Sequence, residues 1–151
     1  MQPDRSFAER YRPDLERASS HYHGLLGRIG TLVQYEKFDV DGLLNWAETA
    51  EGMIDHRVDK RNHAALYEIH GRILVRKGQM REGRAKLQRA VAINPHPQNG
   101  AVLQLMKLDV LLEERDEYLD LRSRFFGDRQ VPIAVRELDR KLRMGSAAHR
   151  P

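Results

Sequence analysis

Residues 64–97 have the sequence AALYEIHGRILVRKGQMREGRAKLQRAVAINPHP, and this stretch decides the architecture that we expect for the chain. Aromatic, small and bulky residues recur in it at steps of three and four: Tyr67, Gly71 and Leu74 in the first half, and Gly83, Leu87 and Ala90 in the second. Such steps place residues on one face of an α-helix. Gly78 interrupts the pattern, and Pro95 ends it because proline cannot continue a helix. The stretch therefore predicts a hairpin of two helices, 64–77 and 81–93, that cross closely where both carry glycine.

The order of residues in this hairpin resembles a tetratricopeptide repeat, a 34-residue unit with aromatic, small, bulky and proline positions at these offsets. Residues 64–97 cover one full unit. His70, Met80 and Gly83 depart from the apolar, aromatic and alanine residues that are usual in the family. The resemblance implies stacked antiparallel hairpins. It also implies a concave groove, lined by the first helices of successive units, that binds peptides or helices of other proteins.

Helical periodicity continues on both sides of this unit. The further predicted helices cover residues 13–36, 39–54, 101–114, 117–126 and 132–143. Asn62 is a candidate cap for the helix that follows it. We find no strand pattern beyond residues 131–133, which contain a proline. The predicted fold class is therefore all-α.

The domain organisation follows from these helices. Three stacked hairpins, at 13–55, 63–94 and 99–126, are expected to form a TPR-like α–α superhelix with a C-terminal capping helix. Together they make a single domain over residues 13–144. A flexible arm at 1–12 is expected before it, and a disordered tail at 145–151 after it.

Composition excludes several classes of protein. No run approaches 18 consecutive apolar residues, which excludes a membrane span, and the absence of cysteine excludes disulfides and cysteine-based metal sites. Charge is uneven, because residues 57–100 hold 10 Lys/Arg against 3 Asp/Glu, whereas residues 1–56 have a net charge of −4. A basic middle section favours an acidic partner, although a solvated helix surface explains it as well.

The candidate partner-binding residues follow from the resemblance. The groove-facing positions that it implies are Ala65, Glu68, Ile69, Arg72, Val75 and Arg76, and Tyr67 is a further candidate contact. Two guanidinium groups on one helix face suit a carboxylate or an acidic peptide. An ion pair within the helix, between Glu68 and Arg72, is the alternative. The lysine/asparagine set that clamps a C-terminal carboxylate in some family members is absent.

Two other classes of function have weaker support. The candidate basic patch for a nucleic acid consists of Arg81, Arg84, Arg89, Arg136 and Arg140, but no aromatic residues are interleaved for base stacking and no DNA- or RNA-reading motif occurs. We find no catalytic or metal-binding motif among the histidines. The acidic series Asp109, Glu113, Asp116, Glu117 and Asp120 is interpreted as an exposed face of mixed charge. No enzyme activity, cofactor or metal is therefore predicted.

The leading hypothesis is a non-enzymatic adaptor, chaperone or assembly factor that binds another protein. One alternative is a soluble domain of a larger bacterial cell-envelope protein, similar to polysaccharide polymerases or ligases. A second alternative is nucleic-acid binding through the basic 57–100 face, and self-association also stays open. Without a signal sequence a cytoplasmic location is expected, or a periplasmic one if the chain is part of a membrane protein.

Overall fold

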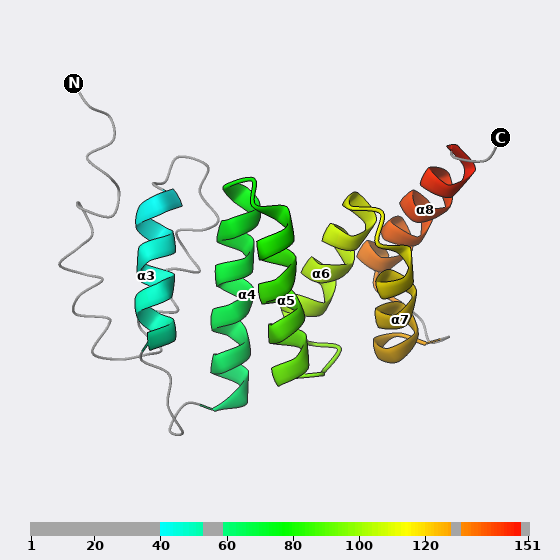
Figure 1. Cartoon of the computed structure of the whole chain (residues 1–151). Helices are drawn as coiled ribbons and strands as arrows, with labels where there is room; N and C mark the ends of the chain where they lie inside the picture. The colour runs from blue at the N-terminus through cyan, green and yellow to red at the C-terminus, as the bar shows by residue number, and fades with distance from the viewer. Residues whose placement is uncertain (1–39, 53–58, 128–130, 149–151) are drawn as a thin grey trace.

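The computed structural model describes residues 40–52, 59–127 and 131–148, and all regular secondary structure in these ranges is α-helical (Figure 1). The helices are α3 (Val40–Gly52), α4 (Lys60–Arg76), α5 (Met80–Ile93), α6 (Gly100–Leu111), α7 (Arg115–Phe125) and α8 (Ile133–Ala148). The predicted all-α class is confirmed. The predicted arm at 1–12 and the predicted helix at 13–36 lie outside the described residues.

The start of α4 and the end of α8 differ most from the prediction. Helix α4 begins at Lys60, because the side chain of Asp59 caps it by accepting a hydrogen bond from the backbone N–H of Asn62 at 2.8 Å. Asn62 is therefore inside the helix and is not its cap. Helix α8 continues to Ala148, so residues 145–148 of the predicted tail are helical.

Helices α4 and α5 form the predicted hairpin and approach each other closely at two glycines. A Cβ atom on Gly71 would lie 2.9 Å from the carbonyl oxygen of Gly83, and one on Gly83 would lie 2.8 Å from the carbonyl oxygen of Gly71. Any side chain at either position would force the helices apart. The turn between them contains Gly78 with φ +90°, a left-handed conformation that glycine adopts without strain. The close crossing expected from the sequence is thus confirmed.

The remaining helices continue the stack. Helix α6 packs against both α4 and α5, α7 packs against α6, and α8 packs against α6 (Figure 1). The core of this part is apolar and includes Leu87, Val91, Val102, Leu105, Met106, Tyr118, Leu121, Val135 and Leu138. Alternate helices are therefore neighbours: α4 lies beside α6, and α6 lies beside α8. This arrangement leaves one face of α4 and α6 available to line a surface.

His70, a polar residue on the inner side of α4, has a partner for its buried ring. The ring is 4% exposed, and its Nδ1 lies 2.5 Å from Oε1 of Glu51, which also accepts a hydrogen bond from Lys86 Nζ at 2.9 Å. Burial alone would raise the pKa of Glu51, but the hydrogen bonds from His70 and Lys86 lower it below its ordinary value. The three side chains join α3, α4 and α5 through one buried polar contact, where an apolar residue would leave Glu51 without its ring partner.

Candidate partner-binding surface on α4 and α6

One face of α4 borders two neighbouring hollows. The residues of α4 that line them are spaced three or four apart, with one adjacent pair at the end: Arg61, Ala65, Glu68, Arg72, Val75 and Arg76. This spacing keeps them on one side of the helix. The structure therefore brings Glu68, Arg72 and Arg76, three of the predicted contact residues, onto a single concave surface.

The first hollow, which we call the basic hollow, lies between α4 and α6 and has a volume of about 280 Å³. Its described lining consists of Arg72, Val75, Arg76, Leu87, Gln104, Lys107, Leu108 and Leu111. None of these residues is acidic. Leu111 is 65% exposed, an unusual state for a large aliphatic side chain beside a cavity. The basic hollow therefore combines an apolar floor with three cationic side chains.

The second hollow, the polar hollow, has a volume of about 450 Å³. It lies between α4 and the loop that leads into α6, and is lined by Arg61, Ala65, Glu68, Asn94, His96, Gln98, Asn99 and Gly100. Asn99 fixes this loop: its amide donates to the carbonyl of Asn94 at 2.8 Å, and its side-chain oxygen accepts from the N–H of Ala101 at 3.1 Å. The wall of the polar hollow is thus held in place by the cap of α6.

Glu68 lines the polar hollow and has no ion-pair partner among the described residues. No cationic nitrogen in these ranges lies within 4.0 Å of its carboxylate, so the alternative interpretation, an ion pair with Arg72 within the helix, is not formed. Burial raises the pKa of Glu68, and the more distant charge of Arg72 opposes this rise. A Cβ atom at Gly100 would lie 2.7 Å from Oε1 of Glu68, so glycine at the start of α6 leaves room for the carboxylate.

Two other predicted contact residues lie elsewhere on α4. Ile69 is buried in the core with 9% exposure. The Tyr67 ring is directed toward α5, where Lys86 Nζ and the Arg89 guanidinium lie 5.2 and 5.3 Å from its centre. Consecutive residues of a helix are about 100° apart, so the neighbours of Glu68 point away from the hollows. Lys107, Leu111 and Gly100 were missed, because they belong to α6, which carries no repeat signature.

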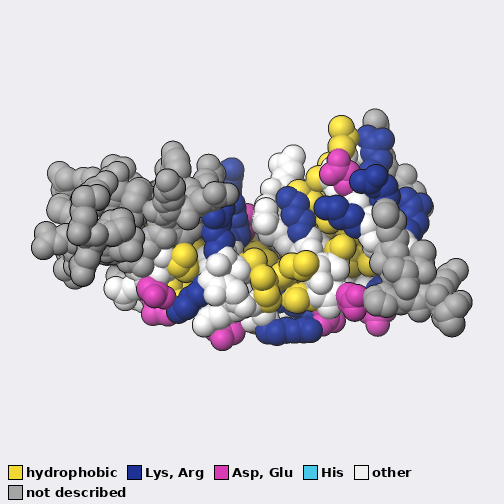
Figure 2. Space-filling model, turned by 90° about the horizontal axis from the view of Figure 1, so that it is seen from above, with side chains coloured by type: hydrophobic (Ala, Val, Ile, Leu, Met, Phe, Trp, Pro, Cys, Tyr) yellow, Lys and Arg dark blue, Asp and Glu magenta, His cyan; other side chains and the backbone are white. Residues whose placement is uncertain are grey.

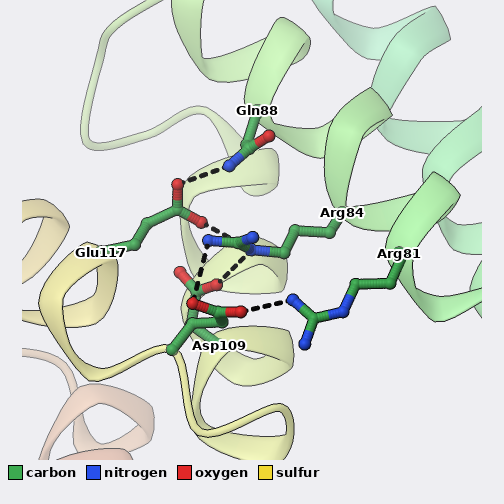
Figure 3. A network of polar contacts seen from close by, with 6 residues as sticks. Arg81, Arg84, Gln88, Asp109 and Glu117 are labelled. Atoms are coloured by element: carbon green, nitrogen blue, oxygen red, sulfur yellow. Dashed lines mark hydrogen bonds and ion pairs between the residues drawn. The ribbon is translucent and has the colours of Figure 1, made fainter.

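The candidate basic patch on α5 is largely neutralised within the fold (Figure 3). Nε of Arg84 lies 3.0 Å from Oδ1 of Asp109 and 3.2 Å from Oε1 of Glu117, and Arg81 pairs with Glu114. Gln88 donates a further hydrogen bond to Glu117. These contacts connect α5 to α6 and α7 and place Arg84 among carboxyl groups, so it is not available to neutralise phosphates. Arg81 and Arg89 stay exposed at the surface.

The interpretation of the acidic series as an exposed face holds for Glu113, Asp116 and Asp120, which are exposed, and is wrong for Asp109. Asp109 is 0% exposed, and its Oδ2 accepts no hydrogen bond from the described residues. Burial raises the pKa of Asp109 to about 8, and hydrogen bonding to the Glu117 carboxyl adds to the rise, whereas Arg84 lowers it. Helical spacing is compatible with this burial, because Asp109 lies four residues after Leu105 and three before Leu112. The charge of Asp109 led to its assignment to an exposed face.

The C-terminal end carries a separate basic surface. Arg136 and Arg140 are exposed on α8. Seen from above in Figure 2, Lys and Arg side chains gather beside hydrophobic ones in this region. A third hollow of about 470 Å³ lies between α7 and α8, and its lining includes Arg115, Leu119 and Arg143. Its floor is fixed by the Tyr118 hydroxyl, which donates to Asp139 at 2.5 Å.

The described residues carry neither a metal-binding cluster nor a membrane-spanning helix. Among them, no cluster of three His, Asp or Glu side chains has the geometry to hold a metal ion. No described helix has the length and apolar character needed to cross a membrane. No family model, curated protein or solved structure matches the chain. Functional inference therefore starts from the geometry of the hollows.

Proposed function

We propose that this chain is a non-enzymatic protein–protein interaction module, an adaptor, chaperone or assembly factor, that binds a segment of a partner protein along α4 and α6. The observation that supports this function is the basic hollow, in which an apolar floor is bordered by Arg72, Arg76 and Lys107. A partner that inserts one large apolar side chain and presents an acidic neighbour complements both features. We further propose that α4 and α6 are the first helices of two successive TPR-like units.

The energetic contributions of the two features differ. Burying a Leu-sized side chain on the apolar floor contributes about 1.5–3 kcal/mol. The exposed cations add less affinity, because solvent and salt screen them, but they select acidic partners and speed association. The floor should therefore set the affinity, and the cationic rim should set the specificity.

Affinity capture from a lysate of the native host tests this function. The wild type is compared with Arg72→Glu/Lys107→Glu, which reverses two charges of the basic hollow. Arg136→Glu/Lys141→Glu is the matched control, because it replaces the same residue types at exposed positions of α8. Circular dichroism confirms that all three proteins keep their helix content.

We expect the wild type and the control to retain a common protein that the basic-hollow variant loses. Equal capture by all three proteins would contradict the proposed site. Loss in the α8 variant alone would move the binding surface to the C-terminal end of the chain.

A further inference from the structure

We infer that the partner segment is extended and carries opposite charges two positions apart: a Lys or Arg that pairs with Glu68, and an Asp or Glu next to a large apolar residue that occupies the basic hollow. This inference rests on the proposed function and specifies the partner for the same surface. The inference follows from the charges that line the two hollows. The polar hollow contains Glu68, whereas the described lining of the basic hollow, about one turn further along α4, contains cations and no carboxylate.

Glu68 accounts for the cationic residue of the partner. Its carboxylate lines the polar hollow, is partly buried, and has no ion pair among the described residues. Arg61 lines the same hollow and Arg72 acts on Glu68 from a distance, but neither forms an ion pair with its carboxylate. A partly dehydrated carboxylate without a cation in contact gains from an incoming ammonium or guanidinium group. The polar hollow provides the opening through which such a group reaches it.

Arg72 and Lys107 account for the acidic residue of the partner. Both line the basic hollow, and its described lining contains no carboxylate to balance them. The apolar floor lies directly beside these cations, formed in part by Leu108 and by the exposed Leu111. An acidic side chain adjacent to a leucine-sized residue therefore satisfies both parts of this hollow.

The spacing of the two charges follows from helix geometry. Glu68 and Arg72 are four residues apart, which corresponds to about 6 Å along α4. An extended chain rises about 3.3 Å per residue, and its residues i and i+2 point to the same side. Opposite charges two positions apart in an extended segment therefore match Glu68 and Arg72. Because the pairing fixes which end of the segment lies over which hollow, it also fixes the direction of binding.

The amide side chains favour an extended segment over a helix. Gln98 lines the polar hollow and Gln104 lines the basic hollow. An extended backbone has unpaired N–H and C=O groups that such amides bind, whereas a helix satisfies these groups internally. The surface thus offers backbone contacts at both ends and charge contacts between them.

Selection from a displayed library of random ten-residue peptides tests the inference. The wild type is compared with Glu68→Lys, with Glu68→Gln, which keeps the shape and removes the charge, and with the exposed control Glu137→Lys on α8. We expect the wild type and Glu137→Lys to enrich a basic residue two positions from an acidic one that adjoins an apolar residue. Glu68→Lys should enrich an acidic residue in place of the basic one, and Glu68→Gln should show no charge preference there.

Synthetic peptides then measure the effect. A selected peptide should bind Glu68→Lys about tenfold more weakly than the wild type, and exchanging its basic residue for Glu should reverse this order. Peptides that share only an acidic residue beside an apolar one, and that Glu68→Lys selects equally, would overturn the inference. The proposed function would not be contradicted by that result. Absence of any enriched sequence also overturns it, whereas capture of a partner protein still decides the proposed function independently.

Discussion

Two of the junctions between described helices, α4 with α5 and α5 with α6 and α7, are built in different ways. Helices α4 and α5 meet backbone to backbone at Gly71 and Gly83, in an environment without charge at the crossing. Helix α5 is connected to α6 and α7, in contrast, through Arg84, Asp109 and Glu117 as well as through apolar packing. The contribution of the glycine crossing depends on shape and should be insensitive to pH, apart from the His70–Glu51–Lys86 contact nearby. The second junction contains a buried carboxyl group, so its stability should vary with pH.

The largest effect is expected at the glycine crossing. Gly71→Val places branched carbon atoms where a Cβ alone would already lie 2.9 Å from both Gly83 O and Leu87 Cγ. We expect the free energy of unfolding to fall by about 3 kcal/mol, the upper part of the range for overpacked sites. Urea unfolding followed by circular dichroism measures it. Gly52→Val is the control, since a Cβ at Gly52 has no neighbour within 4 Å. A loss no larger than that of the control would contradict the close crossing.

Removing the cation of the second junction should have a smaller effect that depends on pH. Arg84→Met removes the cation beside Glu117 and leaves Oδ1 of Asp109 without its donor, which we expect to cost about 2 kcal/mol at pH 5. The cost should rise above pH 8, where the Asp109 carboxyl that loses its cation is ionised. In the double variant Arg84→Met/Asp109→Asn the loss at pH 8 should be smaller than the sum of the two single losses. Strictly additive losses would show that the two side chains do not interact.

The pH dependence of the wild type reports on Asp109 directly. Its pKa is about 8 in the folded chain and 3.8 when unperturbed, so folding binds a proton between these values. The contribution of the Asp109 proton to the free energy of unfolding is therefore fully present below pH 4 and is lost as pH rises toward 8. Between these values the free energy of unfolding falls by on the order of 1 kcal/mol per pH unit. His63, whose pKa is lowered by burial, acts in the opposite direction and is present in both proteins compared.

Asp109→Asn is the matched variant for this measurement, because it keeps the shape of the protonated side chain. We expect its free energy of unfolding to lack the slope that distinguishes the wild type between pH 5 and pH 8. Chemical unfolding of both proteins at intervals of half a pH unit gives the comparison. Parallel pH profiles would contradict a proton held by Asp109 in the folded chain.

The difference between the junctions also explains what the sequence was able to predict. Gly71, Gly83 and Pro95 act through local geometry, so their spacing indicates a hairpin without knowledge of its neighbours. Asp109 lies between apolar residues on a helix of mixed charge, and only the packing of α5 against α6 shows that it is buried. Arg84 looked like a surface cation because its acidic partners are 25 and 33 residues away in the sequence.

The candidate site shows the same division. Glu68, Arg72 and Arg76 were predicted because the resemblance to a tetratricopeptide repeat implies that these positions face a groove. Lys107 and Leu111 belong to the neighbouring helix, which lacks a repeat signature, and were not found. Ile69 was included as a groove-facing position that the resemblance implies, and Tyr67 as a further candidate contact. Ile69 is instead buried in the core, and the Tyr67 ring lies against Lys86 and Arg89 of α5. A single helix predicts half of a groove, since the other half depends on which helix stacks beside it.

The smallest effect on stability, and the sharpest contrast with both junctions, is expected at Leu111. Its side chain is 65% exposed, so Leu111→Ser should change the free energy of unfolding by less than about 0.5 kcal/mol. Binding of the captured partner or selected peptide should nevertheless weaken about tenfold, because the basic hollow loses an apolar wall. Leu119→Ser, at an exposed leucine of α7, is the control that should leave both quantities unchanged. If Leu111→Ser and Leu119→Ser bind the partner equally well, the exposed leucine of the basic hollow does not contact the partner, and the basic hollow is not where the partner binds.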